Sequence, residues 1–389
     1  MLATRMSRFS LLGVLALGAA CTDVPTSLTP EDVEPDLAVS SRAAVDVIVV
    51  LSESFAAGSH AANQASARGV ARSLGVEPTH AYGTAVHGFA GRVPEGRLQA
   101  LQRDPRIAYV EIDQIVSLAP PPGRGKPGDG GGDDPPSGQQ TPWGITRVGG
   151  AGDGSGKTAW IIDSGIDLDH PDLNVDVGRS ADFTGSRKGP DDENGHGTHV
   201  AGTDAAIDNG QGVVGVAAGA SVVAVRVLNR RGSGSYAGVI AGVDYVAANG
   251  GSGDVANMSL GGGFSQAVND AVEAAAATGV KFSLAAGNES IDAATRSPAS
   301  ANGPNIYTVS AFAQGDAWAS FSNFGNPPVD YGAPGVGVLS TYKGGGYSTL
   351  NGTSMAAPHV AGILLLGPIK SDGTVSGDPD GDADPIASH

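Results

Sequence analysis

The apolar and polar positions in the N-terminal part of the chain predict a small α+β domain. Patterns typical of strands and helices follow one another at residues 45–51 (strand), 56–74 (helix), 80–93 (one or two strands), 94–102 (helix) and 106–116 (strand). This order is that of a ferredoxin-like sandwich, which we expect at residues 43–118. On the pattern alone, a stand-alone binding domain is an alternative.

A different pattern begins near residue 141 and predicts a larger α/β domain that reaches residue 389. Short apolar runs at 158–163, 222–228 and 280–285 are typical of buried strands, and helical patterns occupy 239–248 and 267–278. Strands that are apolar on both faces and alternate with helices favour a mostly parallel sheet flanked by helices. Functional groups are then expected at the carboxyl edge of the strands.

Three polar segments separate or follow these domains. Residues 22–42 contain several prolines and predict a linker, and residues 119–140 are rich in Gly, Pro and Asp and predict a disordered connection. Residues 376–385 alternate Asp with small residues, but the glycine is misplaced and the final glutamate is missing for a calcium loop. A solvated acidic tail is therefore the favoured interpretation.

Residues 1–21 have the pattern of a secretory signal peptide. Arg5 and Arg8 precede the apolar residues 9–17, and small residues lead to Cys21. This ending resembles a bacterial lipoprotein cleavage site, although Gly18 stands where leucine is usual; lipid attachment to Cys21 and plain cleavage after residue 20 both remain open. We expect a secreted protein, whose precursor is attached to a membrane only if Cys21 carries a lipid.

Composition and charge narrow the choice of function. The chain has 389 residues, 40% of them hydrophobic, which is enough for a sizeable core. Its formal net charge of −17 argues against a nucleic-acid partner. Because Cys21 is the only cysteine, disulfides cannot stabilise the chain. No stretch after the signal is long and apolar enough to cross a bilayer.

Three short stretches carry candidate chemistry. Ser354 lies among small residues just before an apolar helical run, where unpaired backbone N–H groups favour negative charge. Alone it would be typical of an ordinary capping serine. A serine hydroxyl becomes a nucleophile only beside a base that a third group orients. Asp163 ends an apolar strand pattern, and His196 stands in a glycine-rich turn that opens a helix. The sequence therefore offers both a candidate base and a candidate group to orient it.

These stretches, in the order Asp, His, Ser, resemble the signature blocks of the subtilisin-type serine proteases, closest to the proteinase K branch. The resemblance implies that Asp163 is the acid, His196 the general base and Ser354 the nucleophile. It also implies that Asn288, at the end of residues 284–288, donates to the oxyanion. We expect the nearby His199 to be structural, because the glutamate of a zinc-binding His-Glu-x-x-His motif is missing.

The resemblance extends to a substrate cleft and to calcium. Two segments would hold an extended peptide as an added strand, and the block that ends at Asn288 adjoins them. The candidate binding residues are Gly232, Ser233, Gly234, Ser259, Leu260, Gly261, Ala286 and Gly287. Oxygen ligands for a structural Ca²⁺ are implied at Gln139, Asp172, Ile207, Asn209, Gln211 and Val213, and for a second site at Pro304, Ile306 and Asp330. A metal-free surface loop is the alternative for the first site.

The whole pattern predicts a secreted, monomeric serine endopeptidase of broad specificity that acts on polypeptides. Residues 43–118 resemble the pro-domains that inhibit such proteases, so we expect a self-processing precursor with Leu118 in the primary specificity pocket. The alternative is a proteolytically silent surface-binding protein with the same fold. Such a protein would be expected to lose one of the four catalytic residues, and none is lost here.

Overall fold

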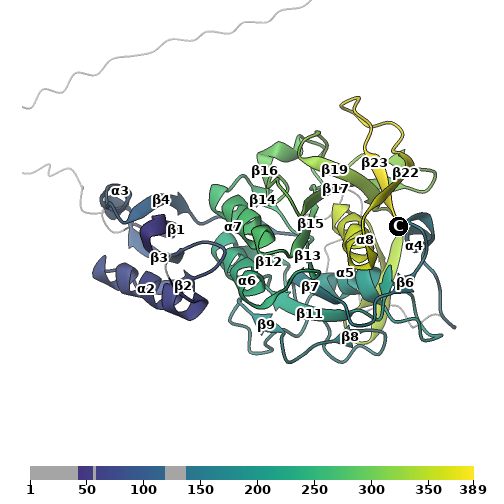
Figure 1. Ribbon diagram of the computed structural model, residues 1–389, viewed down its shortest axis with the longest axis horizontal. Helices are drawn as coiled ribbons and strands as arrows, with labels where there is room; N and C mark the ends of the chain where they lie inside the picture. The colour runs from purple at the N-terminus through teal and green to yellow at the C-terminus, as the bar shows by residue number, and fades with distance from the viewer. Residues whose placement is uncertain (1–42, 56–57, 119–136) are drawn as a thin grey trace, which may run out of the picture.

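The computed structural model describes residues 43–55, 58–118 and 137–389. The proposed signal peptide, the linker before residue 43 and most of the connection between the domains lie outside the described residues. Figure 1 shows a small N-terminal domain packed against one side of a much larger one. Within the part of the chain that is described, no helix has the length and apolarity to cross a membrane.

The N-terminal domain is the ferredoxin-like sandwich that the sequence predicts. Its antiparallel sheet has the order β2-β3-β1-β4, and an apolar core lies between the sheet and its helices. The helix α2 begins after Ser59, whose side chain accepts a hydrogen bond from the backbone N–H of Ala62. Its elements are β1 (Ala44–Leu51), α2 (His60–Ser73), β2 (Pro78–Tyr82), β3 (Gly88–Pro94), α3 (Leu98–Gln102) and β4 (Ile107–Ile112).

The last strand of this domain differs from the prediction, because residues 106–116 form two strands rather than one. After β4 the chain turns at Asp113, whose carboxylate accepts a hydrogen bond from the backbone N–H of Ala237 in the large domain. The next strand, β5 (Ile115–Ser117), leaves the sheet and pairs with β12 (Ser233–Ser235). The interdomain contact ends the first strand and starts the second.

The large domain is built on one twisted sheet, in the order β22-β23-β19-β17-β15-β13-β7-β11-β8. Every pair along it is parallel except β22 with β23. The strands are β7 (Thr158–Asp163), β8 (Asn174–Val175), β11 (Ser221–Arg226), β13 (Val255–Met258), β15 (Lys281–Ala285), β17 (Ile306–Ala313), β19 (Val329–Pro334), β22 (Lys370–Thr374) and β23 (Pro385–Ser388). This is the predicted α/β architecture.

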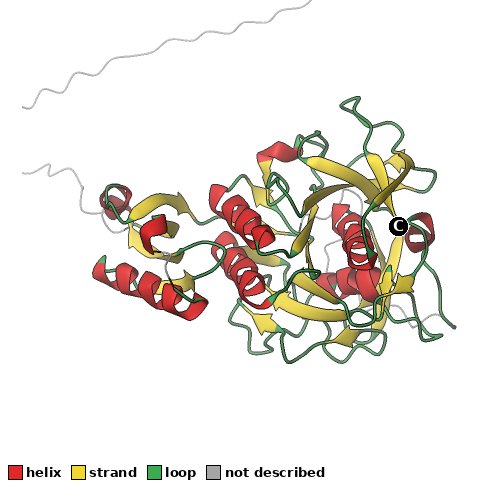
Figure 2. Cartoon of the chain, viewed as in Figure 1, coloured by secondary structure: helices red, strands yellow, loops and turns green. Residues whose placement is uncertain are grey.

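Helices cover both faces of this sheet, as the red elements in Figure 2 show. The helices α5 and α8 share one apolar cluster, and α6 and α7 share the other, against which the N-terminal domain also packs. The helices are α4 (Trp143–Arg147), α5 (His196–Ala205), α6 (Tyr236–Asn249), α7 (Gln266–Ala277) and α8 (Thr353–Leu366). The short strands outside the main path are β6 (Gly152–Asp153), β9 (Ala181–Asp182), β10 (Ala217–Ala218), β14 (Gly262–Gly263), β16 (Arg296–Ser297), β18 (Ala317–Trp318), β20 (Val338–Tyr342) and β21 (Gly346–Leu350).

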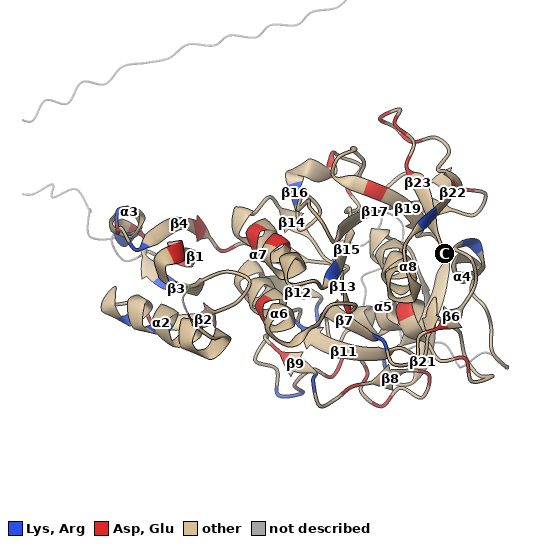
Figure 3. Ribbon diagram, in the orientation of Figure 1, with Lys and Arg blue, Asp and Glu red and all other residues tan. Residues whose placement is uncertain are grey.

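The helix α8 is almost wholly buried, and it carries no charged residue, as Figure 3 shows. The C-terminal segment that follows it is solvated only in part: residues 376–383 are largely exposed, as expected of an acidic tail, but the strands on either side of them join the sheet. Strand β23 joins the edge of the main sheet beside β19, and Ile386 and Asp384 are fully buried. The Asp384 carboxylate accepts hydrogen bonds from Ser310 Oγ and Asn326 Nδ2. The apolar residues of β23 and these buried hydrogen bonds hold the segment in place, and the chain between its two strands remains largely exposed.

Candidate active site

Asp163 and His196 are in direct contact at the carboxyl edge of the sheet. Asp163 ends the buried strand β7, is fully buried, and accepts a hydrogen bond of 2.6 Å from the backbone N–H of Ser164. Both of its carboxylate oxygens lie 2.9 Å from Nδ1 of His196. A carboxylate at Nδ1 fixes the imidazole ring and leaves Nε2 to exchange a proton with other groups.

His196 is the first residue of α5, and two features hold it there. The Asp192 carboxylate accepts hydrogen bonds from the backbone N–H groups of Asn194 and Gly195, which fixes the turn before the helix. Gly197 lets the helix approach the end of β7, because a Cβ at this position would lie 2.1 Å from the carbonyl oxygen of Gly165. The glycines of this block are therefore required by close packing.

Ser354 is the second residue of α8 and faces the segment that follows β13. Its Oγ donates to the carbonyl oxygen of Ser259 at 3.2 Å, and Ser259 Oγ donates to the carbonyl oxygen of Ser354 at 2.8 Å. Among the described residues, no hydrogen bond joins Ser354 to His196. In this structure the Ser354 hydroxyl is therefore directed to Ser259.

Asn288 lies beside the start of α8. Its Oδ1 accepts hydrogen bonds from N (2.9 Å) and Oγ1 (3.0 Å) of Thr353, which fixes the orientation of the side-chain amide. A Cβ added to Gly352 would be 3.6 Å from both Asn288 Nδ2 and the backbone N of Ser354. These two donors therefore lie close to the same point beside Gly352.

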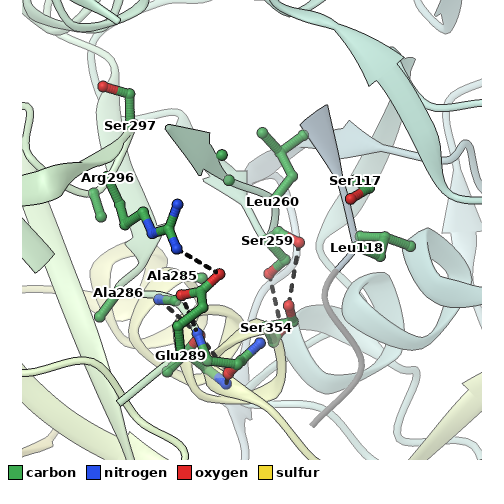
Figure 4. A pocket seen from close by; sticks show the side chains of 16 residues that line it. Ser117, Leu118, Ser259, Leu260, Ala285, Ala286, Glu289, Arg296, Ser297 and Ser354 are labelled. Carbon is green, nitrogen blue, oxygen red and sulfur yellow. Dashed lines mark hydrogen bonds and ion pairs between the residues drawn. The ribbon is translucent and has the colours of Figure 1, made fainter. Parts of the chain in front are cut away.

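A cavity opens next to Ser354 and is called the primary cavity here (Figure 4). It contains most of the predicted cleft residues, together with others that the sequence analysis did not identify. Its walls are formed by Ser259, Leu260, Gly261 and Gly262 on one side and by Ala285, Ala286, Gly287 and Asn288 on the other, with Glu289, Arg296, Ser297 and Ala299 completing the lining. Glu289 directly follows Asn288 in the sequence, so its position beside a predicted site residue could have identified it. Nothing in the sequence marks Arg296.

The other predicted cleft residues hold the last strand of the N-terminal domain. Strand β5 pairs antiparallel with β12, with Ser117 opposite Ser233 and Val116 opposite Gly234. On the other side of β5, Gln114 Nε2 donates to the carbonyl oxygen of Phe264. An extended segment thus lies between two edges of the large domain, in the way the sequence analysis expects of a substrate.

Leu118 borders the primary cavity, but its side chain does not fill it, and this corrects the expectation that Leu118 occupies the pocket. Its backbone N–H donates to the carbonyl oxygen of Gly232 at 2.8 Å, and its side chain lies against Gly232. Figure 4 shows the Leu118 side chain pointing away from Ser354. The pairing of β5 with β12 sets this register, and sequence alone could not specify it.

The residues predicted to bind calcium come together around Asp172, which is 1% exposed. Its carboxylate accepts hydrogen bonds from Asn209 Nδ2 and from the backbone N–H of Val213, both at 2.9 Å. Gln139 Oε1 accepts hydrogen bonds from the backbone N–H groups of Asn209 and Gly210. Burial raises the pKa of Asp172, so a neighbouring cation would stabilise its charged form.

At the second site, Asp330 accepts a hydrogen bond from the backbone N–H of Thr308 at 2.9 Å, close to Ile306 in β17. The described residues contain no group of three or more His, Cys, Asp or Glu side chains that could hold a metal. Calcium at either place would therefore depend mainly on carbonyl and amide oxygens.

His199 has the structural role that the sequence analysis expects. It is fully buried, and its Nε2 donates to the carbonyl oxygens of Val338 (3.0 Å) and Ser348 (3.1 Å). Burial lowers the pKa of His199 to about 3, so the ring is neutral. The histidine joins α5 to the hairpin of β20 and β21, and it does not face Asp163.

Comparison with known proteins identifies two family models in the chain. The subtilase family model matches residues 154–367, and the peptidase inhibitor I9 model matches residues 46–119. The second match falls on the N-terminal domain and on the strand that occupies the cleft.

Similar proteins carry protease names. Alkaline serine exoprotease A of Vibrio alginolyticus is 42% identical over 295 residues, which cover 72% of this chain but only 51% of that protein. A subtilisin-like serine protease, AsES, of Sarocladium strictum is 39% identical over 306 residues, covering 75% of this chain and 72% of the relative. A solved structure, that of a cold adapted subtilisin-like serine proteinase, is 39% identical with a TM-score of 0.55, covering 63% of this chain and 96% of that one.

Proposed function

This chain belongs to the subtilase family of serine proteases, and we propose that Asp163, His196 and Ser354 form its catalytic triad. The observation that carries the proposal is the pair of 2.9 Å contacts between Nδ1 of His196 and the buried Asp163 carboxylate. In this arrangement His196 Nε2 takes the proton of Ser354 Oγ as the oxygen attacks a peptide carbonyl. His196 then gives the proton to the leaving amine.

We propose that the negative oxygen of the tetrahedral intermediate is bound by Asn288 Nδ2 and the backbone N–H of Ser354. Both donors border the space beside Gly352, and the contacts of Thr353 hold the Asn288 amide in advance. Donors that are already oriented need no reorganisation when charge develops. A water molecule then attacks the acyl carbon as His196 Nε2 removes its proton, and His196 returns that proton to Ser354 Oγ as the acyl group leaves as a carboxylic acid.

Substrates would bind as β5 does, as an added strand along β12 with the primary cavity receiving the side chain before the cleaved bond. Backbone hydrogen bonds supply most of such an interaction, which supports an endopeptidase of broad specificity. The binding residues that we propose are Gly232, Ser233, Gly234, Ser259, Leu260, Gly261, Ala286 and Gly287.

The precursor would be inhibited by its own N-terminal domain, because β5 occupies the cleft. We propose that the same Ser354 cuts this domain from the chain. Secretion, directed by residues 1–21, would release the protein, and a lipid on Cys21 would attach the precursor to a membrane only before maturation.

We also propose that Ca²⁺ binds beside Asp172 as a structural ion. Gln139, Asn209 and Gln211 would supply amide oxygens, and Ile207 and Val213 would supply carbonyls, a ligand set that suits Ca²⁺. The ion would compensate the buried carboxylate and tie the start of the large domain at Gln139 to its body. A second ion would use Pro304, Ile306 and Asp330.

The triad is tested by changing Ser354 to Ala and expressing the full chain in a host that lacks other proteases. The wild-type chain is expected to lose its N-terminal domain and to hydrolyse peptide amides, whereas Ser354→Ala stays at full length and is inactive. Ser371→Ala, at an exposed serine, is the matched control and should mature normally. Normal maturation of Ser354→Ala would show that self-cleavage is wrong.

A further inference from the structure

Arg296 brings a positive charge into the lining of the primary cavity, which otherwise consists mainly of small and apolar residues. It lies in the short strand β16, where it pairs with Gly263 of β14. Figure 4 shows its guanidinium directed toward the Glu289 side chain at the edge of the cavity. A side chain that enters the cavity from the substrate would approach both groups.

The guanidinium of Arg296 is only partly satisfied. Its Nε is buried and has no hydrogen-bond partner among the described residues. Its ion pair with Glu289 is long, with 3.7 Å between Nη2 and Oε1. An unpaired buried donor is costly, so the guanidinium lacks full satisfaction inside the protein. The Arg296 side chain is 28% exposed, so its terminal N–H groups can meet an acceptor that a ligand supplies.

The Glu289 carboxylate makes its hydrogen bonds to other residues, so it leaves N–H groups of Arg296 free to bind a ligand. Its Oε2 accepts hydrogen bonds from the backbone N–H of Asn288 (3.0 Å) and from Asn323 Nδ2 (2.9 Å). These neutral donors hold the carboxylate against the loop that follows β15. The Arg296 N–H groups are therefore the part of the pair that a substrate can use.

We propose that Arg296 makes the primary cavity selective for a substrate side chain that ends in an acceptor oxygen, glutamate or glutamine, over lysine. The inference rests on the proposed function, because it concerns the residue before the cleaved bond (P1). A planar guanidinium binds a carboxylate or carboxamide oxygen through directed hydrogen bonds, and it repels an ammonium group. Apart from Arg296 and Glu289, the lining consists mainly of small residues, which do not compete for the guanidinium.

The test uses the mature enzyme and four p-nitroanilide peptides with the sequence Val-Ser-Leu-X, where X is Glu, Gln, Met or Lys. The first three residues copy residues 116–118, which occupy the cleft in this structure. Methionine is the comparison of similar length without a side-chain amide or carboxylate. We expect kcat/KM for Gln and Glu to exceed that for Lys by about tenfold to a hundredfold, the usual effect of a hydrogen bond to a charged group.

The variant Arg296→Met should lower the Glu-to-Met and Gln-to-Met ratios of kcat/KM by a similar factor. Glu289→Gln should raise the Glu-to-Met ratio, because it removes a competing carboxylate. Arg187→Met, at an exposed arginine, removes the same charge elsewhere and should leave both ratios as in the wild type. A Gln-to-Glu comparison separates hydrogen bonding from charge.

Two results would overturn the proposal. One is a higher kcat/KM of the wild-type enzyme for the Lys peptide than for the Glu and Gln peptides. This measurement does not depend on the maturation of any variant. The other is an Arg296→Met enzyme with unchanged ratios; if that variant does not mature, Arg296→Lys replaces it and should reduce the ratios by loss of the planar fork. Absence of cleavage of all four peptides would instead count against the proposed protease function.

Discussion

At the residue scale, the side chains of the candidate active site are oriented by hydrogen bonds at one atom, which directs a second atom of the same side chain toward the site. Asp163 holds His196 at Nδ1, and Thr353 holds Asn288 at Oδ1. Replacing the oxyanion donor in this family costs a factor of about 10²–10³ in kcat, a measured value rather than one obtained from this geometry. Ser354 differs, because its hydroxyl donates to the carbonyl oxygen of Ser259 and, among the described residues, has no hydrogen bond to His196.

Asp204 is a buried carboxyl group that does not line the primary cavity. It lies in α5, is fully buried, and neither carboxylate oxygen has a hydrogen-bond partner among the described residues. Burial therefore raises its pKa well above the ordinary value, which favours the protonated form in the folded protein. Such a group weakens the fold.

We predict that Asp204→Ala stabilises the protein, and that the gain grows with pH. Below the ordinary carboxyl pKa, both the folded and the unfolded chain are protonated at this residue. Above it the unfolded chain ionises while the folded one does not, so the wild type loses stability as pH rises toward the raised pKa. The gain near pH 8 should be about 1–3 kcal/mol, the usual cost of an unsatisfied buried group.

Thermal unfolding of Ser354→Ala precursors at pH 5 and pH 8 measures this effect without self-digestion. Asp204→Asn is the matched control, because it keeps the polar group and removes only the ionisation. Both variants should have a smaller fall in Tm between the two pH values than the parent. Equal falls in all three proteins would contradict the assignment of a buried, protonated Asp204.

At the element scale, α6 is one of the elements that support the N-terminal domain. The Asp244 carboxylate on this helix accepts hydrogen bonds from the backbone N–H groups of Gly83 (2.9 Å), Thr84 (2.6 Å) and Ala85 (2.8 Å). It is 1% exposed in the precursor. One carboxylate thus satisfies three consecutive donors in the loop between β2 and β3.

We predict that Asp244→Ala weakens inhibition by the N-terminal domain. Hydrogen bonds to a charged group contribute about 1.5–3 kcal/mol, so the inhibition constant of recombinant residues 43–118 should rise at least about tenfold. Hydrolysis of small peptides by the mature variant should be little changed, because Asp244 does not line the primary cavity. Glu273→Ala, at an exposed acid on α7, is the control. Equal inhibition of all three enzymes would show that the contact is not important for docking.

At the scale of the whole molecule, stability cannot come from disulfides, because the chain has a single cysteine. Its formal net charge is −17, and mutual repulsion of the acidic groups opposes compaction. A bound cation would offset both disadvantages. An ion that binds only the folded state adds about 2.7 kcal/mol at a hundredfold excess over its Kd.

We predict that EGTA accelerates thermal inactivation and autolysis of the mature enzyme, and that Ca²⁺ restores stability better than Mg²⁺, which requires a tighter octahedral site. Asp172→Ala should shrink the calcium effect while the initial kcat is nearly unchanged, because Asp172 lies outside the triad. Asp153→Ala, at an exposed acid in β6, is the control. Equal inactivation rates in EGTA and in millimolar Ca²⁺ would contradict the proposed ion.

The sequence by itself determined the family, the two-domain α/β and α+β architecture and the candidates for the triad. Asp163, His196 and Ser354 each stand in a short contiguous block, because each role requires a particular strand end or helix start that nearby residues form. The buried strand β7 and the helix α8 are apolar on all sides, which makes them visible in the hydrophobic pattern.

Only the tertiary structure decided which distant residues meet. Arg296 lines the primary cavity because β16 pairs with β14. The side chain of Leu118 lies against Gly232 instead of filling that cavity, because β5 pairs with β12 in one particular register. The C-terminal strand β23, which follows the exposed acidic residues, likewise joins the main sheet by pairing with β19, some fifty residues earlier in the chain. Strand register and long-range pairing depend on the summed packing of both partners, and no local pattern specifies them.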